Sequence, residues 1–326
     1  MSGNLKGALL ALVAFGLYSS HDVIVKLMGV GYSPFQLIFF SVLFSFPIAI
    51  LIMMRDARPG TLLPVHPWWV TLRTAAALLT GISAFYAFSV LPLADVYAII
   101  FASPLLITIL AIPILGEKVR IRRWIAVLVG LVGVIIVLDP SGADLTLGHL
   151  AALAAAFGGA VASVIARKIG PEERSVVLLL YPMMANFLFM AIALPWVYEP
   201  PELSHLGFFA GMAILGSAGG LLIIAAYKAG EAVIVAPMQY SQILWATLFG
   251  ALVFGELPGM QTVIGATVII ASGLYIVLRE SRAGTSQNRP VLQSRQRPET
   301  GTIARKPNLF GLAGRSGMGP PRRNQS

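Results

Sequence analysis

The sequence predicts an all-α integral membrane protein whose ten transmembrane helices form two inverted repeats of five. The first observation is composition: 57% of the 326 residues are hydrophobic and only 11% are charged, whereas soluble proteins carry about 25% charged residues. The second is ten continuous apolar runs, and the third is a set of residues that recurs in the two halves at offsets of 139 and 141 positions. A soluble globular, disordered or fibrous protein is excluded by this composition.

Each apolar run is long enough to cross a bilayer core about 30 Å thick as a helix. The runs are continuous rather than alternating, which favours helices over a membrane β-barrel. The first run is too long for the apolar part of a cleavable signal peptide, so we expect it to remain as a span. We expect the ten spans at 5–27, 34–54, 68–90, 95–115, 122–139, 147–166, 176–197, 206–228, 232–254 and 260–278.

The net charge of +9 lies mostly in the last segment, 279–326, which holds ten basic and two acidic residues. Its polar, Gly- and Pro-rich composition predicts a disordered tail. If the N-terminus is cytoplasmic, the inner connections hold eleven Lys and Arg without the tail, and the outer ones hold only Lys26. The positive-inside rule therefore predicts that both termini and the basic tail are cytoplasmic.

An internal repeat divides the membrane part into 5–139 and 147–278. Gly116-Glu117 recurs as Gly255-Glu256. Five residues from Gly7 to Gly29 recur 141 positions later, and Lys26 falls on Arg167 at the same offset. Because five is an odd number of spans, the second repeat must enter the membrane upside down relative to the first. Inverted repeats are typical of secondary transporters, which bind their substrates near the bilayer midplane.

Ten spans in a 5+5 repeat, with a Gly-Glu before the last span of each half, resemble the drug/metabolite transporter superfamily in its EamA branch. The resemblance covers 5–278. It implies a carrier of small metabolites in a bacterial inner membrane, working by alternating access without an ATPase module or a cofactor. It also implies a small-molecule substrate and the lipid bilayer as partners, and no nucleic acid.

Three segments look like the bacterial riboflavin-uptake carriers: YSSHDVIVK (18–26), SPFQLIFFSVLFSFP (33–47) and HPWW (66–69). Many relatives have Arg-Gly where this chain has Phe40-Ser41. Riboflavin uptake is the substrate that this resemblance implies. Export of amino acids or other small metabolites is the alternative on the same fold, and a membrane-embedded enzyme or a channel is the alternative of another class.

Ionisable side chains within spans are costly in lipid and therefore predict functional positions. Tyr18, Asp22 and Lys26 share one stripe of the first span, with His21 beside it. Asp22 and His21 are candidates for a proton carrier or substrate anchor; alternatively Asp22 pairs with Lys26, whose amino group reaches outward. Arg73 either reaches the cytoplasmic interface or contacts an anion. Asp22, Lys26 and Arg73 are thus the coupling or gating candidates.

The fourth and ninth spans are predicted to line the substrate site. Both contain a proline, which frees a backbone carbonyl, and the ninth span concentrates amides and aromatic rings that could bind a planar substrate. Packing between helices is the alternative for the amides. Asn186 and Tyr181 are weaker candidates. The binding candidates are Tyr18, His21, Asp22, Tyr86, Tyr97, Gln239, Tyr240, Gln242 and Trp245.

Glu117 and Glu256 are expected to be structural, each next to the positive N-terminus of the helix that follows. Glycines on the fifth and tenth spans predict close packing, as a scaffold or as a homodimer surface. The chain has no cysteine, and its four histidines are scattered. No spacing indicates a metal site or catalytic residues, so we expect a protein that is neither a metalloprotein nor an enzyme.

Overall fold

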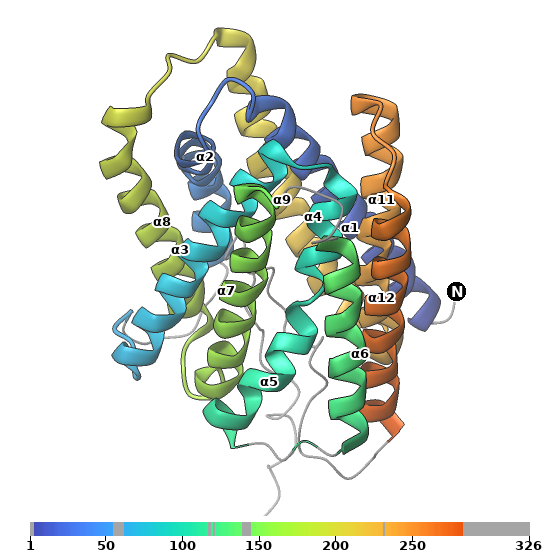
Figure 1. The fold of residues 1–326 in the computed structure, drawn as a ribbon. Coiled ribbons are helices and arrows are strands. Elements are labelled where there is room, and N and C mark those ends of the chain that lie inside the picture. The colour runs from blue at the N-terminus through green and yellow to red at the C-terminus, as the bar shows by residue number, and fades with distance from the viewer. Residues whose placement is uncertain are drawn as a thin grey trace, which may run out of the picture.

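A computed structural model describes residues 3–54, 62–116, 119, 121–138, 145–230 and 232–282, and within these the regular elements are all helical. The bundle is shown in Figure 1. The elements of the first half are α1 (Gly3–Met28), α2 (Pro34–Met54), α3 (Pro67–Val90), α4 (Leu93–Ile100), α5 (Ser103–Leu115) and α6 (Ile121–Leu138). Those of the second half are α7 (Leu147–Ile169), α8 (Ser175–Val197), α9 (Leu203–Ala229), α10 (Ala232–Val235), η1 (Ala236–Tyr240), α11 (Ser241–Phe249), η2 (Gly250–Phe254) and α12 (Met260–Arg282).

The protein is a multi-pass membrane protein. Seven of the described helical segments are long and apolar enough to cross a bilayer, and two shorter apolar helices lie within α6 and α12. The outer surface of α6 illustrates the lipid-facing chemistry, because its exposed side chains Ile121, Ile125, Leu128, Val132 and Ile135 follow one helical stripe. Such a large exposed apolar face is rare on a soluble monomer and is the surface that a bilayer solvates.

The fourth and ninth expected spans are interrupted. The fourth consists of α4 and α5, which meet at Phe101–Ala102 directly before Pro104. The ninth was expected as one span, 232–254, but it is split into α10, the 3₁₀ segment η1 with Pro237, α11 and the π segment η2. Proline has no N–H to donate to the preceding turn, which explains a break at these positions. Short π segments in helices frequently occur at functional sites.

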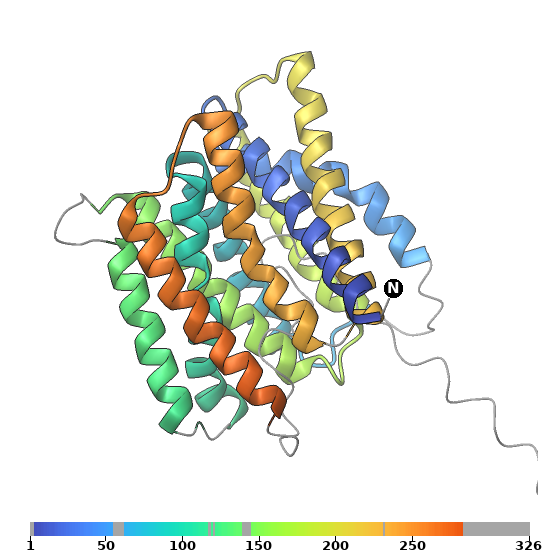
Figure 2. The same ribbon diagram turned by 90° about the vertical axis from the view of Figure 1, so that its right-hand side faces the viewer.

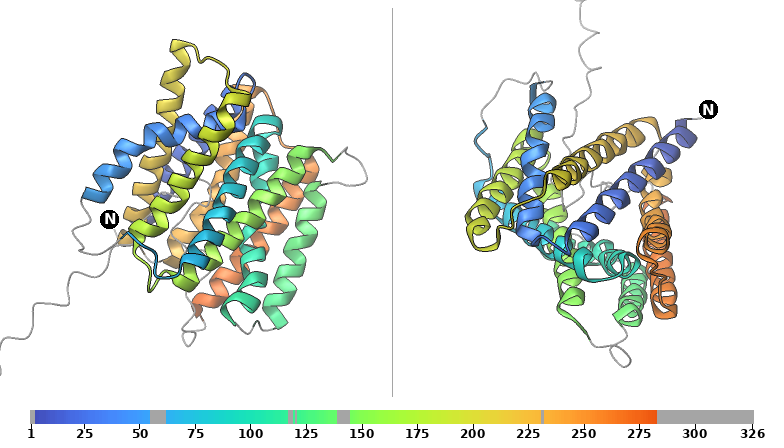
Figure 3. Two further views of the ribbon diagram at one scale, coloured as in Figure 1. Left: turned by 90° about the vertical axis from the view of Figure 1, so that its left-hand side faces the viewer. Right: turned by 90° about the horizontal axis from the view of Figure 1, so that it is seen from above.

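Helices from the two halves pack in pairs. The most extensive contacts join α1 with α9, α3 with α7, and α6 with α12, followed by α5 with α7 and α2 with α8. The α6–α12 pair lies on one side of the bundle and the α2–α8 pair on the opposite side, as Figure 1 and the view from above in Figure 3 both show. The first and second halves are therefore interlocked rather than separate.

Two glycines with positive φ end corresponding helices in the two halves. Gly116 ends α5 with φ of 69°, and Gly255 ends η2 with φ of 66°. A left-handed residue is a common stop for a helix, and glycine adopts it without a Cβ clash. Glu256 donates its backbone N–H to the carbonyl of Gly250 over 2.9 Å, which closes this end of the helix.

The glycines of α6 and α12 serve contacts within the chain. A Cβ on Gly265 would lie 2.5 Å from the carbonyl oxygen of Gly133, and one on Gly130 would lie 2.5 Å from the hydroxyl of Ser272. These close contacts between α6 and α12 agree with the expectation that the two helices form a scaffold within the chain. The expectation of a homodimer surface stays a prediction. Helix α12 extends to Arg282, four residues beyond the predicted span end at 278. Glu117 and 283–326 of the expected tail lie outside the described residues.

Candidate functional site

A small cavity lies between helices of both halves. Its volume is about 30 Å³, which is room for about two water molecules. In the described conformation this cavity is therefore too small for a whole metabolite. The lining comes from α1, α2, α3, α8 and α9, namely His21, Ile38, Ser41, Val42, Ser45, Phe85, Met183, Asn186, Met212, Ala213, Gly216 and Ser217.

Two buried polar atoms on the cavity residues have no hydrogen-bond partner among the described residues. They are Nε2 of His21 and Oδ1 of Asn186. The Asn186 amide nitrogen is already used, donating to the carbonyl of Pro182 over 2.9 Å. A buried polar atom without a partner costs about 1–3 kcal/mol, so a water or a substrate group that enters the cavity gains these two interactions.

Behind the cavity, His21 belongs to a buried polar network that joins α1, α4 and α11. Its Nδ1 lies 2.7 Å from Oδ1 of Asp22, and the hydroxyl of Tyr97 donates to the other carboxylate oxygen. That hydroxyl can accept from Oγ of Ser19 at 3.4 Å and from Nε2 of Gln242 at 3.3 Å. The network unites four sequence candidates, His21, Asp22, Tyr97 and Gln242, although His21 alone among them lines the cavity.

The other aromatic candidates lie outside the cavity lining. Tyr18 is buried against the Gly219 backbone, and the ring of Trp245 packs beside Gly16 and stacks on Phe249. These rings and the ninth span do not line this cavity. The expectation that they bind the substrate stays a prediction.

Tyr240 fills the contact between the ninth span and α12. Its ring packs edge-on against Phe101 with centroids 5.2 Å apart, and its hydroxyl occupies the space where a Cβ on Gly273 would stand. Tyr86 and Gln239 are half-buried and lie outside the cavity lining. Tyr240 thus has a packing contact that explains its burial without a substrate.

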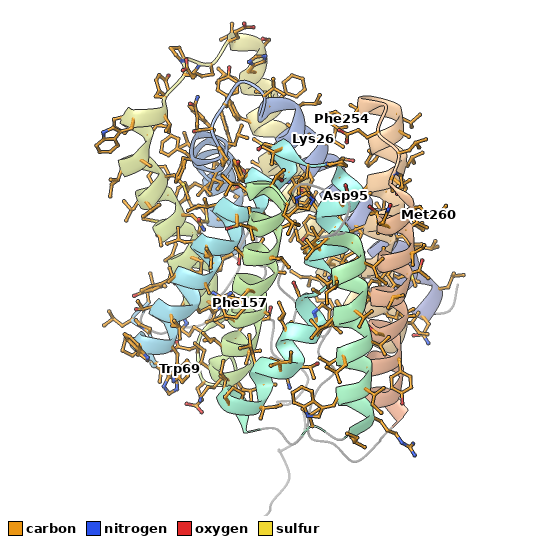
Figure 4. All side chains as sticks on the ribbon, in the orientation of Figure 1. Lys26, Trp69, Asp95, Phe157, Phe254 and Met260 are labelled. Atoms are coloured by element: carbon orange, nitrogen blue, oxygen red, sulfur yellow. The ribbon has the colours of Figure 1, made fainter. Side chains whose placement is uncertain are left out.

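Lys26 and Glu256 form an ion pair between the two halves. Nζ of Lys26 lies 2.7 and 2.6 Å from the two carboxylate oxygens of Glu256 and donates to the carbonyl of Leu91 over 2.8 Å. The amino group also sits 4.9 Å from the centre of the Phe254 ring. Figure 4 shows Lys26 and Phe254 at the end of the bundle where α1 finishes and α12 begins.

This arrangement differs from two sequence expectations. Lys26 was expected to reach outward or to pair with Asp22, but it is buried and held by Glu256. The carboxylate of Glu256 was expected to interact with the positive end of the next helix, yet its strong partner is Lys26 on the other half of the chain. The repeat relates equivalent positions of the two halves. Lys26 and Glu256 are 230 positions apart and are not equivalent, so the repeat does not indicate that they meet.

Arg73 is buried at 3% exposure instead of reaching the interface. Its Nη1 donates to the carbonyl of Leu178 over 2.7 Å. Residue 182, four positions after Leu178, is a proline and has no N–H for that carbonyl. Arg73 from α3 therefore satisfies an acceptor that Pro182 leaves free in α8, and this structural contact accounts for its position.

Two matches to the EamA-like transporter family model cover residues 5–139 and 146–279. The chain belongs to the EamA-like transporter family. This confirms the family resemblance, and with it a protein of a transporter family rather than an enzyme. Ser41, Ser217 and the two methionines of the cavity were missed by sequence reasoning, because small hydroxyls and methionines are common in packed spans.

Three relatives of this EamA-like transporter carry names that state a cargo. The S-adenosylmethionine uptake transporter of Rickettsia bellii is 29% identical over 81% of this chain and 91% of its own length. The riboflavin transporter of Vibrio cholerae is 29% identical over 57% of this chain and 62% of its own. The pseudopaline exporter of Pseudomonas aeruginosa is 25% identical over 85% of this chain and 97% of its own.

A solved crystal structure shares the fold. It matches with a TM-score of 0.55 and 20% sequence identity over 87% of this chain and 99% of that chain. All three relatives are named as carriers of small metabolites; the first is named for uptake and the third for export. Transport of a small metabolite is thus the shared activity, while its direction and cargo differ among relatives.

Proposed function

We propose that this EamA-like transporter is a secondary carrier that moves a small metabolite with a planar ring across the bacterial inner membrane by alternating access. The observation that carries the proposal is the cavity, which lies between helices of both halves and is lined by His21 and Asn186, each with a buried polar atom that has no partner among the described residues. A site between two halves can be exposed to either side in turn when the halves rock against each other.

The helix contacts support ten spans in two inverted repeats of five. When α4–α5 and α10–η2 are each counted as one span, α1 corresponds to α7, α2 to α8, α3 to α9 and α5 to α11. Exchanging the two halves then turns the α1–α9 contact into the α7–α3 contact, and both contacts occur. The same exchange turns α1–α11 into α7–α5 and α2–α9 into α8–α3, all of which occur. Such exchangeable contacts are expected when a two-fold axis relates two similar halves, and an odd number of spans in each half gives the halves opposite orientations.

The same topology supports cytoplasmic termini. In Figure 2, the start of α1 and the end of α12 both point toward the lower right of the bundle, as an even number of crossings requires. The connections on this side hold eleven Lys and Arg without the tail, and those on the other side hold one. The positive-inside rule then assigns the side of the termini to the cytoplasm. On this assignment, the Lys26–Glu256 ion pair lies at the periplasmic end.

Contacts between the halves at both ends support an occluded state. At the periplasmic end, Lys26 binds Glu256, and the hydroxyl of Tyr32 lies 2.7 Å from Nδ1 of His205. At the opposite end, Nζ of Lys168 lies 4.2 Å from the Trp69 ring. Opening to either side requires that one set separate while the other holds, and the cavity must expand to admit a substrate.

Riboflavin is the first substrate that we propose. The described lining residues include no carboxylate and no Lys or Arg, which suits a neutral ring system, and the lining contains two aromatic rings, those of His21 and Phe85. S-Adenosylmethionine is the second candidate, because the relative named for it aligns over a larger share of this chain. Export of a metabolite remains the alternative direction.

Counterflow in proteoliposomes tests the proposal. Vesicles loaded with unlabelled riboflavin, or with unlabelled S-adenosylmethionine, receive a trace of the same labelled compound outside. We expect rapid exchange of one compound and a large loss of exchange in Asn186→Leu, which removes the free amide oxygen. Thr267→Val is the matched control, since this exposed hydroxyl on α12 lies outside the cavity lining. Absence of exchange for both compounds, with folded protein in the vesicles, would reject both substrates.

A further inference from the structure

His21 and Asp22 form a buried acid–base pair at the wall of the cavity. The two side chains are each 2% exposed, with 2.7 Å between Nδ1 and Oδ1. Nδ1 of His21 points to Asp22, while Nε2 is buried without a partner among the described residues. The ring also packs edge-on against Phe85, which fixes its orientation at the cavity.

The pair gives the cavity an atom whose hydrogen-bonding role depends on one proton. With Asp22 ionised, its carboxylate only accepts hydrogen bonds, and Nδ1 of His21 then bears the hydrogen that Asp22 accepts. Nε2 of the neutral ring then has a lone pair and accepts. When Nε2 takes up a proton, it becomes a donor, and the net charge of the pair changes from −1 to zero. Histidine undergoes this change in the physiological range of pH more readily than other side chains.

Neighbouring helices add few other titratable groups around His21. Tyr97 of α4 is already bound to Asp22, and Lys26, one turn further along α1, is paired with Glu256. Gln242 of α11 is neutral. The other polar residues of the described cavity lining are also neutral, namely Ser41, Ser45, Asn186 and Ser217.

We infer that His21, held by Asp22, binds the proton that is co-transported with the substrate. A proton from the outer solution binds the lone pair of Nε2 when the cavity faces the periplasm, and the resulting N–H donates to an acceptor atom of the substrate. The substrate and the proton are released together when the cavity faces the cytoplasm, and Nε2 regains its lone pair. This inference rests on the proposed carrier function and adds the driving ion and its residue.

Proteoliposomes with a pH gradient test the inference. Potassium and valinomycin hold the membrane potential at zero, and labelled riboflavin or S-adenosylmethionine is the probe, whichever shows counterflow. With the outside acidic, one proton per substrate predicts accumulation of about tenfold for each pH unit, since these two ratios represent the same free energy. A pH dye inside the vesicles should report proton entry only when substrate is added.

Variants separate coupling from transport. His21→Gln and Asp22→Asn should keep part of the counterflow at equal pH but lose accumulation, with the inside-to-outside ratio falling to about one. His149→Gln is the matched control, because this residue caps the start of α7 away from the cavity. Wild-type counterflow without any response to the pH gradient would overturn the inference and leave the proposed function intact.

A spectroscopic measurement keeps the inference testable without a known substrate. NMR of the detergent-solubilised wild-type chain with ¹⁵N-labelled histidine follows Nε2 of His21, and its signal is assigned by its absence in His21→Gln. We expect the Nε2 signal to report binding of a proton when the solution is acidified, and Asp22→Asn to alter that response. A ring that stays in one protonation form while the solution is acidified would overturn the inference.

Discussion

The contact of Arg73 with α8 predicts a change in the free energy of unfolding that depends on Arg73 and Pro182. Arg73 donates to the carbonyl of Leu178 over 2.7 Å, and Pro182 is the reason that no backbone N–H comes from the next turn. Arg73→Met keeps the length and apolar packing of the side chain but removes the donor. The buried carbonyl then loses this partner.

We expect Arg73→Met to lower the free energy of unfolding by about 1–2 kcal/mol. An unpaired buried acceptor costs about 1–3 kcal/mol, and hydrogen bonds in membrane helix bundles contribute at the lower end of this range or below it. Pro182→Ala supplies an N–H to the same carbonyl. In that background the cost of Arg73→Met should fall by about 1 kcal/mol, a coupling that a double-mutant cycle measures.

The assay is reversible unfolding in mixed detergent micelles, followed by tryptophan fluorescence, for the wild type, both single variants and the double variant. Arg122→Met is the control, because this arginine is exposed at the start of α6, where substitutions usually change stability by less than about 0.5 kcal/mol. An equal cost of Arg73→Met in both backgrounds would refute the assignment of Arg73 to the carbonyl that Pro182 leaves free.

Three further predictions follow from other contacts. Glu256→Gln weakens the ion pair at the periplasmic end, so labelling of an added Ser217→Cys by an impermeant thiol reagent from that side should become several-fold faster; an unchanged rate would argue against a gate there. Gly265→Ala places a Cβ 2.5 Å from the α6 backbone and should destabilise the protein by about 1–3 kcal/mol, whereas Gly207→Ala, with nothing within 4 Å, should be neutral. A C-terminal reporter should be active only in the cytoplasm, and a reporter active only in the periplasm would reverse the proposed orientation.

Sequence reasoning could predict the helical membrane fold because lipid imposes simple rules. Apolar length gives the spans, and proline marked the breaks that the structure shows before Pro104 and at Pro237. The extent of the second break was not predictable, because 3₁₀ and π segments depend on which neighbours satisfy the freed backbone groups. The family followed from a repeat that is visible as paired residues, such as Gly116 and Gly255.

The candidate site was less predictable, because it depends on which side chains meet across distant spans. His21 and Asp22 stood out as ionisable residues in an apolar span, and the structure brings Tyr97 and Gln242 to them. The polarity of the ninth span predicts a cavity wall there, and this stays a prediction; the cavity described above lies among α1, α2, α3, α8 and α9. Polarity within a span identifies a buried face but does not say whether a substrate or another helix covers it.

The proposed carrier binds its metabolite in the cavity beside His21. The chain contains no cysteine, so Ser217→Cys places a single thiol in the cavity wall without further changes. Its rate of reaction with a small thiol reagent should fall several-fold when riboflavin or S-adenosylmethionine is present at saturating concentration. The same compound should leave the rate of Ser272→Cys, between α6 and α12, unchanged. The protein exchanges one of these compounds if the proposal is correct. An unchanged reaction rate of the thiol at position 217 in the presence of that compound would contradict binding of the metabolite in this cavity.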